Sequence, residues 1–130
     1  MIHKINAIDT GSCTMEFLDL STIRLQYADN ITIDLAQMKE DFLAYDEFTE
    51  GRKLHKLIIA GEQTDMTKEA RLFAQTENQK RSKLIYCEAL VLHTKHQVFL
   101  GNLYSLFAQL NYPTKVFSNE KQARAWIKKF

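Results

Sequence analysis

The sequence is poor in the residues that build disulfide frameworks, zinc sites and phosphate-binding loops. Its two cysteines, Cys13 and Cys87, both lie in apolar, strand-like stretches, a setting typical of buried free thiols. Their number and spacing match neither a disulfide framework nor a zinc motif. The four glycines are dispersed singly, so no glycine-rich phosphate loop is present. A nucleophile elbow and a His-Glu-x-x-His motif are also missing. We therefore expect no enzyme, no catalytic residue, no metal and no cofactor.

Charge of one sign and long apolar runs are missing too. The 17 basic residues nearly cancel the 16 acidic ones, which gives a net charge of +1. General nucleic-acid binding needs a basic excess, so nucleic acid is not an expected partner. No run approaches the ~18 apolar residues of a membrane-spanning helix, and residues 1–6 lack the apolar core of a signal peptide. We expect a cytoplasmic protein without a membrane span.

What the sequence does contain is enough apolar material for one folded domain. It has 130 residues, of which 45% are hydrophobic, and eight are phenylalanine. A chain of this size can fold without disulfides or metals. We expect a single domain over residues 1–130, in which residues 1–11 are a loose lead-in.

The stretch 53–74 organises the rest of the chain. The apolar run 54–59 predicts a strand that is covered on both faces. Gly61 allows the backbone to turn without a side-chain clash. A polar loop follows, and Thr67 is placed to cap the next helix by accepting a backbone N–H. A helix N-terminus can also hold an anion or a phosphorylated side chain, but a simple cap is the favoured interpretation.

The remaining elements follow from hydrophobic periodicity and capping signals. An alternating pattern predicts a hairpin of strands near residues 13–18 and 23–27. Asp34 with Gln37, and Asn119 with Gln122, mark the starts of two more helices. The expected order is β-β-α-β-α-β-α-β-α. It implies an α/β fold with a mixed, mostly parallel sheet of about five strands, an N-terminal β-hairpin and four helices.

Among the charged or metal-ligating features, Glu88 and the His93–His96 pair have two interpretations each, and Asp41 has one. Glu88 stands in the apolar run 87–92, either at the entrance of a strand, which we favour, or as a partly buried carboxylate with a shifted pKa. Asp41 is assigned to the exposed side of the helix that starts at Asp34. His93 and His96 have a spacing that suits a metal on one helix, but no Asp or Glu adjoins them, so no metal site is expected.

The predicted helix 97–110 is apolar around most of its circumference. Phe99, Leu103 and Phe107 are among its large apolar residues. A helix of this kind needs cover on two sides. It is a deeply packed helix, a face for self-association, or one wall of an apolar ligand pocket.

From about residue 23 to 130 the chain resembles the small bacterial STAS-like proteins, which have the anti-sigma-factor-antagonist fold. The likeness rests on short stretches in the C-terminal half: Glu88 to Leu92, Leu100 to Asn102, Tyr112 to Phe117, and Glu120 to Ile127. The resemblance implies the STAS-like fold. It also implies a bacterial, cytoplasmic, non-enzymatic module that acts by protein interaction.

In the antagonists, an Asp-Ser-Ser-Gly-type segment follows the central strand, and its serine is phosphorylated by a partner kinase. The matching stretch here is 64–68, where Thr67, and less securely Thr64, stands in the place of that serine. The Ser-Ser-Gly element itself is absent. By this resemblance Gln63, Thr64, Asp65 and Thr67 form a candidate phosphoacceptor or interaction loop.

Two functions remain after the enzyme is ranked last. The first is a regulatory or protein-interaction module that binds a protein partner, or a second copy of itself as a homodimer. The second is a binding protein for an apolar or amphipathic small molecule, with Phe99, Leu103 and Phe107 in the wall of its pocket. A core without a cavity would contradict the second.

Overall fold

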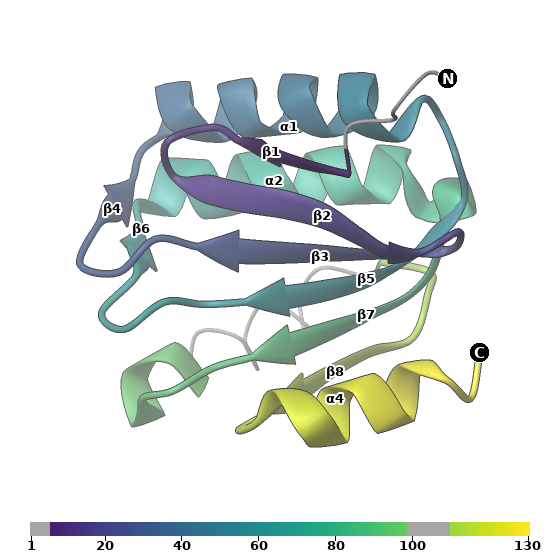
Figure 1. Cartoon of the computed structure of the whole chain (residues 1–130). Coiled ribbons are helices and arrows are strands. Elements are labelled where there is room, and N and C mark those ends of the chain that lie inside the picture. The colour runs from purple at the N-terminus through teal and green to yellow at the C-terminus, as the bar shows by residue number, and fades with distance from the viewer. Residues whose placement is uncertain (1–5, 99–109) are drawn as a thin grey trace.

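One six-stranded sheet forms the centre of the computed structural model, which describes residues 6–98 and 110–130 (Figure 1). The strand order is β1-β2-β3-β5-β7-β8. The strands are β1 (Ala7–Asp9), β2 (Cys13–Asp19), β3 (Thr22–Tyr27), β5 (Leu54–Ile59), β7 (Ile85–Val91) and β8 (Thr114–Phe117). The mixed α/β fold class predicted from the sequence is therefore confirmed.

The sheet has an antiparallel part and a parallel part. β1, β2 and β3 pair antiparallel, and β3, β5, β7 and β8 pair parallel. A separate two-stranded parallel ladder joins β4 (Thr32–Ile33) to β6 (Asp65–Met66). The central sheet has one strand more than expected, because β1 lies in the segment predicted to be a loose lead-in. Three residues are too few to show a periodic pattern, and pairing with β2 creates this strand.

The helices begin where the capping residues predict. Figure 1 shows α1 (Leu35–Thr49), α2 (Lys68–Lys80) and α4 (Glu120–Ile127), and a 3₁₀ turn, η1 (Ser82–Leu84), follows α2. Asp34, Thr67 and Asn119 each accept a hydrogen bond from the backbone N–H three residues on. Residues 95–98 are also helical, and most of the predicted helix 97–110 lies outside the described residues.

Opposite faces of the sheet pack against different helices. Alternate residues of the strands point to opposite faces. Leu57, Ala89 and Val91 pack against Ala123 and Ile127 of α4. The other face packs against α1 and α2, and there Met15 and Leu25 of the sheet join Tyr45 of α1 in one buried cluster. A third cluster, around Ile33, Met38 and Ala70, joins α1 to α2. The candidate site lies on the α1/α2 face.

Gly61 is required by space rather than by an unusual dihedral angle. A Cβ atom at this position would lie 2.5 Å from Asp29 Oδ1, 2.7 Å from the Tyr27 carbonyl oxygen and 2.8 Å from the Ala28 carbonyl carbon. The end of β5 and the loop after β3 therefore touch through their backbones. The sequence-based role of Gly61, a turn without a side-chain clash, is confirmed.

No helix in the described part of the chain combines the length and the hydrophobicity needed to cross a membrane.

Candidate functional site

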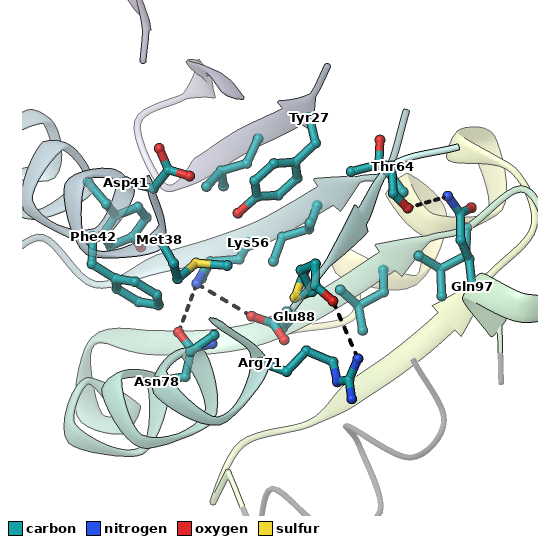
Figure 2. A pocket seen from close by; sticks show the side chains of 18 of the residues that line it. Tyr27, Met38, Asp41, Phe42, Lys56, Thr64, Arg71, Asn78, Glu88 and Gln97 are labelled. Atoms are coloured by element: carbon teal, nitrogen blue, oxygen red, sulfur yellow. Dashed lines mark hydrogen bonds and ion pairs between the residues drawn. The ribbon is translucent and has the colours of Figure 1, made fainter. Parts of the chain in front are cut away.

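A cavity of about 150 Å³ lies between the sheet and helices α1 and α2. Its walls come from β3, β5 and β7 on one side and from the two helices on the other, as Figure 2 shows. Most of the lining is apolar or aromatic, and Asp65 and Arg71 at its edge keep contact with solvent. The apolar and aromatic lining residues include Met15, Leu25, Tyr27, Met38, Phe42, Tyr45, Ile58, Met66, Ala74 and Leu90.

A buried ion pair forms part of the cavity wall. Lys56 on β5 and Glu88 on β7 stand opposite each other in the parallel ladder, and their side chains are 4% and 0% exposed. The Lys56 Nζ atom lies 3.4 Å from Glu88 Oε1 and donates a hydrogen bond to Asn78 Oδ1 at 3.2 Å. It also lies 4.9 Å from the centre of the Tyr45 ring, a cation–π distance. Figure 2 shows the Lys56 ammonium between Asn78 and Glu88.

The environment of Glu88 is unfavourable for its charge. Burial raises the pKa of its carboxyl, and the positive charge of Lys56 opposes that rise. The 3.4 Å contact is longer than a charge-assisted hydrogen bond, which is typically about 2.7–2.9 Å. Neither oxygen of Glu88 accepts a hydrogen bond. The same site raises the pKa of Tyr45, first through burial and then through the Glu88 charge.

The burial of Glu88 corrects the interpretation favoured from the sequence, which placed it at the entrance of a strand. It lies inside β7, and its side chain is fully enclosed. Asp41 is a second correction, because this residue of α1 is 3% exposed and not on the outer face. Asp41 Oδ2 accepts a hydrogen bond from the Ser12 hydroxyl at 2.8 Å, and Oδ1 accepts one from Gln37 Nε2 at 3.0 Å. Neutral donors therefore hold this buried carboxylate.

Neither Lys56 nor Asn78 is a candidate site residue on the sequence alone. The available signal was a lysine inside one apolar strand and a glutamate inside the next. Only the register, which pairs Lys56 with Glu88, shows that the two charges meet. Asn78 lies in a polar stretch that gives no sign of burial, although its side chain reaches the cavity wall.

The predicted loop lies at the edge of this cavity, but only part of it faces inward. Thr64 and Asp65 line the cavity, whereas Gln63 is exposed with a φ of +56°. The Thr64 hydroxyl donates to the Ala28 carbonyl at 2.7 Å. Gln97 Nε2 donates to the Thr64 carbonyl at 3.0 Å (Figure 2). The Thr64 side chain is therefore buried and its hydroxyl is hydrogen-bonded, which makes it a poor phosphoacceptor.

Thr67 is half-buried and caps α2, where its Oγ1 accepts the Ala70 N–H at 3.2 Å. Asp65 is exposed beside it. The three apolar residues predicted for an interface or pocket, Phe99, Leu103 and Phe107, lie outside the described residues.

Replacing Thr67 by alanine is expected to lower the free energy of unfolding by about 1 kcal/mol, because one backbone N–H of α2 loses its side-chain acceptor. Thr67→Ser keeps the acceptor and should change stability little. Urea denaturation of both variants measures the difference. Equal stability of the serine and alanine variants would show that the cap contributes nothing.

The structure also places the two cysteines and the histidines His93 and His96. Cys13 and Cys87 are buried free thiols, as predicted, and burial raises the pKa of Cys87 to about 11. His93 and His96 are both exposed. Among the described residues, no group of three His, Cys, Asp or Glu side chains is placed to hold a metal ion.

Comparison with known families gives a match over most of the chain. The sequence profile of a family described as a domain of unknown function, DUF7793, matches residues 18–130. The chain belongs to this family. No curated protein matches the sequence. Membership in DUF7793 therefore assigns a family without an activity.

This DUF7793 member also resembles a solved structure in its fold. An uncharacterised protein of the DUF3478 family from Shewanella loihica PV-4, with a SpoIIAA-like fold, superposes with a TM-score of 0.66. The match covers 98% of each chain at 12% sequence identity. Similarity at this level shows the fold alone. It confirms the STAS-like fold that the sequence resemblance implied.

Proposed function

We propose that this DUF7793 member is a non-enzymatic binding module that holds a small amphipathic molecule in the cavity beside α1 and α2. One observation carries the proposal: an apolar cavity whose wall contains the buried pair Lys56–Glu88, with the carboxylate lacking any hydrogen bond. An apolar cavity of about 150 Å³ holds a molecule the size of benzene.

The cavity is costly to keep if it serves only the fold. Native interiors are close-packed, and the apolar side chains around a pocket of this size forgo packing contacts that a filled core would make. A buried carboxylate without hydrogen bonds adds a further cost. Local features that oppose folding are expected at functional sites. Glu88 and the space beside it together fit this pattern.

Filling the cavity tests the proposal. Ala74 on α2 lines the cavity and is 8% exposed. Ala74→Met is expected to stabilise the ligand-free protein by about 0.5–2 kcal/mol, because the longer side chain occupies empty space. The same change should weaken binding of benzyl alcohol by at least about tenfold, because the methionine side chain and the ligand would occupy the same volume. Urea denaturation and an NMR titration measure the two effects.

Leu72→Met is the matched control, because Leu72 lies on the same helix and is 52% exposed. It should leave both stability and binding unchanged. If benzyl alcohol binds the Ala74→Met variant as well as the wild type, or binds neither, the cavity is not a binding site.

A role in protein interaction is the second candidate, favoured by the position of the 63–67 loop. Thr64 and Asp65 line the cavity, and the neighbouring Gln63 is exposed. A ligand in the cavity would therefore touch the segment that presents Gln63 and Thr67 to a partner. On this interpretation the chain is a regulatory module whose input is a small molecule.

Native mass spectrometry of the protein purified from its own cells separates the two candidates. A retained small molecule supports the binding module, and a phosphate mapped to Thr67 supports a switch on the loop. A bare, unmodified species counts against the small-molecule binding module and against a phosphate switch, and it leaves the interaction module standing without support. The number of subunits in the native ion also shows whether the chain forms a homodimer.

A further inference from the structure

The charges buried in the described part of the chain all lie in the wall of the cavity, and they do not balance. Asp41, Lys56 and Glu88 are the buried Asp, Glu, Lys and Arg residues there, and each of them lines the cavity. Two carboxylates thus face one ammonium. At the solvent-exposed edge, Arg71 and Asp65 offset each other. The cavity wall carries one formal negative charge in excess.

The partners of Asp41 do not remove this excess. Its hydrogen bonds come from the Ser12 hydroxyl and the Gln37 amide, which are neutral. No basic side chain in residues 6–98 or 110–130 forms an ion pair with Asp41. Lys56 contacts Glu88 and Asn78 and forms no ion pair with Asp41. A buried negative charge without a cation is unfavourable, so the wall favours a cationic occupant.

Glu88 also supplies the atom that such an occupant would contact. Its Oε2 atom is completely buried and accepts no hydrogen bond, although an ionised carboxylate has room for several donors. Buried polar atoms are nearly always satisfied, and an exception requires a reason. Figure 2 places the Glu88 carboxyl among the side chains that line the cavity.

The rest of the wall suits the body of a small organic cation. Aromatic ring faces attract cations, and Tyr27, Phe42 and Tyr45 line the cavity. Met38 and Met66 add flexible thioether side chains that adapt to an irregular apolar shape. The combination of soft apolar walls with one unpaired buried carboxylate oxygen is a complementary surface for a primary ammonium group on a short hydrocarbon.

We infer that the ligand of the proposed binding module is a small organic amine, whose ammonium group donates to Glu88 Oε2 and whose apolar part lies among the aromatic and methionine side chains. The inference rests on the proposed function, because it names the ligand class of the same cavity. The volume of about 150 Å³ limits the body to roughly the size of a benzene ring or a branched C4 chain.

The test compares probes of one shape and different charge. Benzylamine, benzyl alcohol and benzoate are titrated into the wild-type protein at pH 7 and followed by NMR, and isobutylamine with isobutanol gives a smaller matched pair. We expect the amine of each pair to bind at least about tenfold more tightly than the alcohol, because it adds a charged donor to a buried carboxylate. Benzoate should bind most weakly.

Glu88→Gln locates the contact, since glutamine keeps the shape and removes the charge. It should reduce the tenfold preference for benzylamine to less than about twofold while benzyl alcohol still binds. Lys80→Met, an exposed charge removal on α2, is the control and should keep the full preference. The comparison of probes on the wild-type protein requires no variant, so it tests the preference for an amine even if Glu88→Gln does not fold.

Each outcome separates the ligand class from the proposed function. Equal binding of amine and alcohol would overturn the amine and leave the binding module in place. Tighter binding of benzoate than of benzylamine would also overturn the amine as the ligand class. Absence of binding by every probe would overturn the amine together with the proposed function. A preference that persists in a folded Glu88→Gln variant would show that Glu88 is not the contact.

Discussion

Replacing Lys56 by methionine is expected to lower the free energy of unfolding by about 3–5 kcal/mol, the usual cost of breaking a buried ion pair. The change leaves Glu88, which is 0% exposed, without the cation that faces it. Glu88→Met should cost a similar amount, because the ammonium of Lys56 then keeps only the Asn78 amide and the Tyr45 ring. Urea denaturation at pH 7 measures both variants.

The double variant Lys56→Met/Glu88→Met is expected to be about as stable as the wild type, or more stable by about 1–4 kcal/mol. Two apolar side chains of similar volume avoid the cost of desolvating two charges. The double-mutant cycle thus gives a large coupling energy between the two positions. Such a result would indicate that the pair is retained for the cavity and not for stability.

Lys80→Met is the matched control for this cycle. Lys80 forms a shorter ion pair, 2.9 Å from Glu77, but its side chain is 66% exposed. Water and salt weaken such a pair, so the expected loss is below about 1 kcal/mol. If Lys56→Met lowers the free energy of unfolding no more than Lys80→Met does, the result would contradict the burial of the Lys56–Glu88 pair that the structure shows.

The pH dependence of the double variant has a definite sign. Burial raises the pKa of Glu88, against the opposing charge of Lys56. A carboxyl with a raised folded-state pKa stabilises the fold fully below its unfolded pKa of about 4.3, and it loses that contribution as the pH rises through the folded value. The stability of the double variant relative to the wild type should therefore increase from about pH 4 upward. A constant difference across that range would exclude a raised pKa.

Gly61→Ala is the second change with a large expected effect, a loss of about 1–3 kcal/mol. The new Cβ atom would lie within 3 Å of the Tyr27 carbonyl oxygen and the Ala28 carbonyl carbon, as well as Asp29 Oδ1. Two of these three atoms are main chain, so a rotamer change cannot relieve the clash, and the loop after β5 must move. Urea denaturation gives the loss, and NMR chemical shifts give its location.

The displacement should also weaken ligand binding, because Gly61 follows Ala60 and is hydrogen-bonded to Gln97, and both of these residues line the cavity. The Gly61 carbonyl accepts a hydrogen bond from Gln97 Nε2 at 3.1 Å, and the same amide holds the Thr64 carbonyl. Gly51→Asn is the control: this position has a φ of +71°, an added Cβ atom would meet nothing within 4 Å, and asparagine tolerates that conformation. It should change stability little. A harmless Gly61→Ala would mean that the two loops do not touch.

Local signals in the sequence determined where elements begin and turn. The caps at Asp34, Thr67 and Asn119 and the turn at Gly61 depend on one residue and its immediate chain neighbours. Hydrophobic periodicity likewise indicated the order of strands and helices, because burial of one face imposes a fixed spacing. Periodicity did not predict the short strand β1, since this strand exists only through its pairing with β2.

Tertiary structure alone decided which charges are buried and where the cavity lies. Periodicity tells which side of an element faces inward, but it does not tell which residue stands opposite. Lys56 and Glu88 are 32 positions apart in the sequence, and the parallel register of β5 and β7 brings them together. Asp41 was assigned to the surface because it lies in the charged stretch 39–41, and charged side chains on a helix are normally solvated. In the fold, Ser12 of the β1–β2 hairpin donates a hydrogen bond to it instead. The sequence thus determined the fold, and long-range packing determined the site, because a free volume and a buried charge exist only between elements that the sequence does not place side by side.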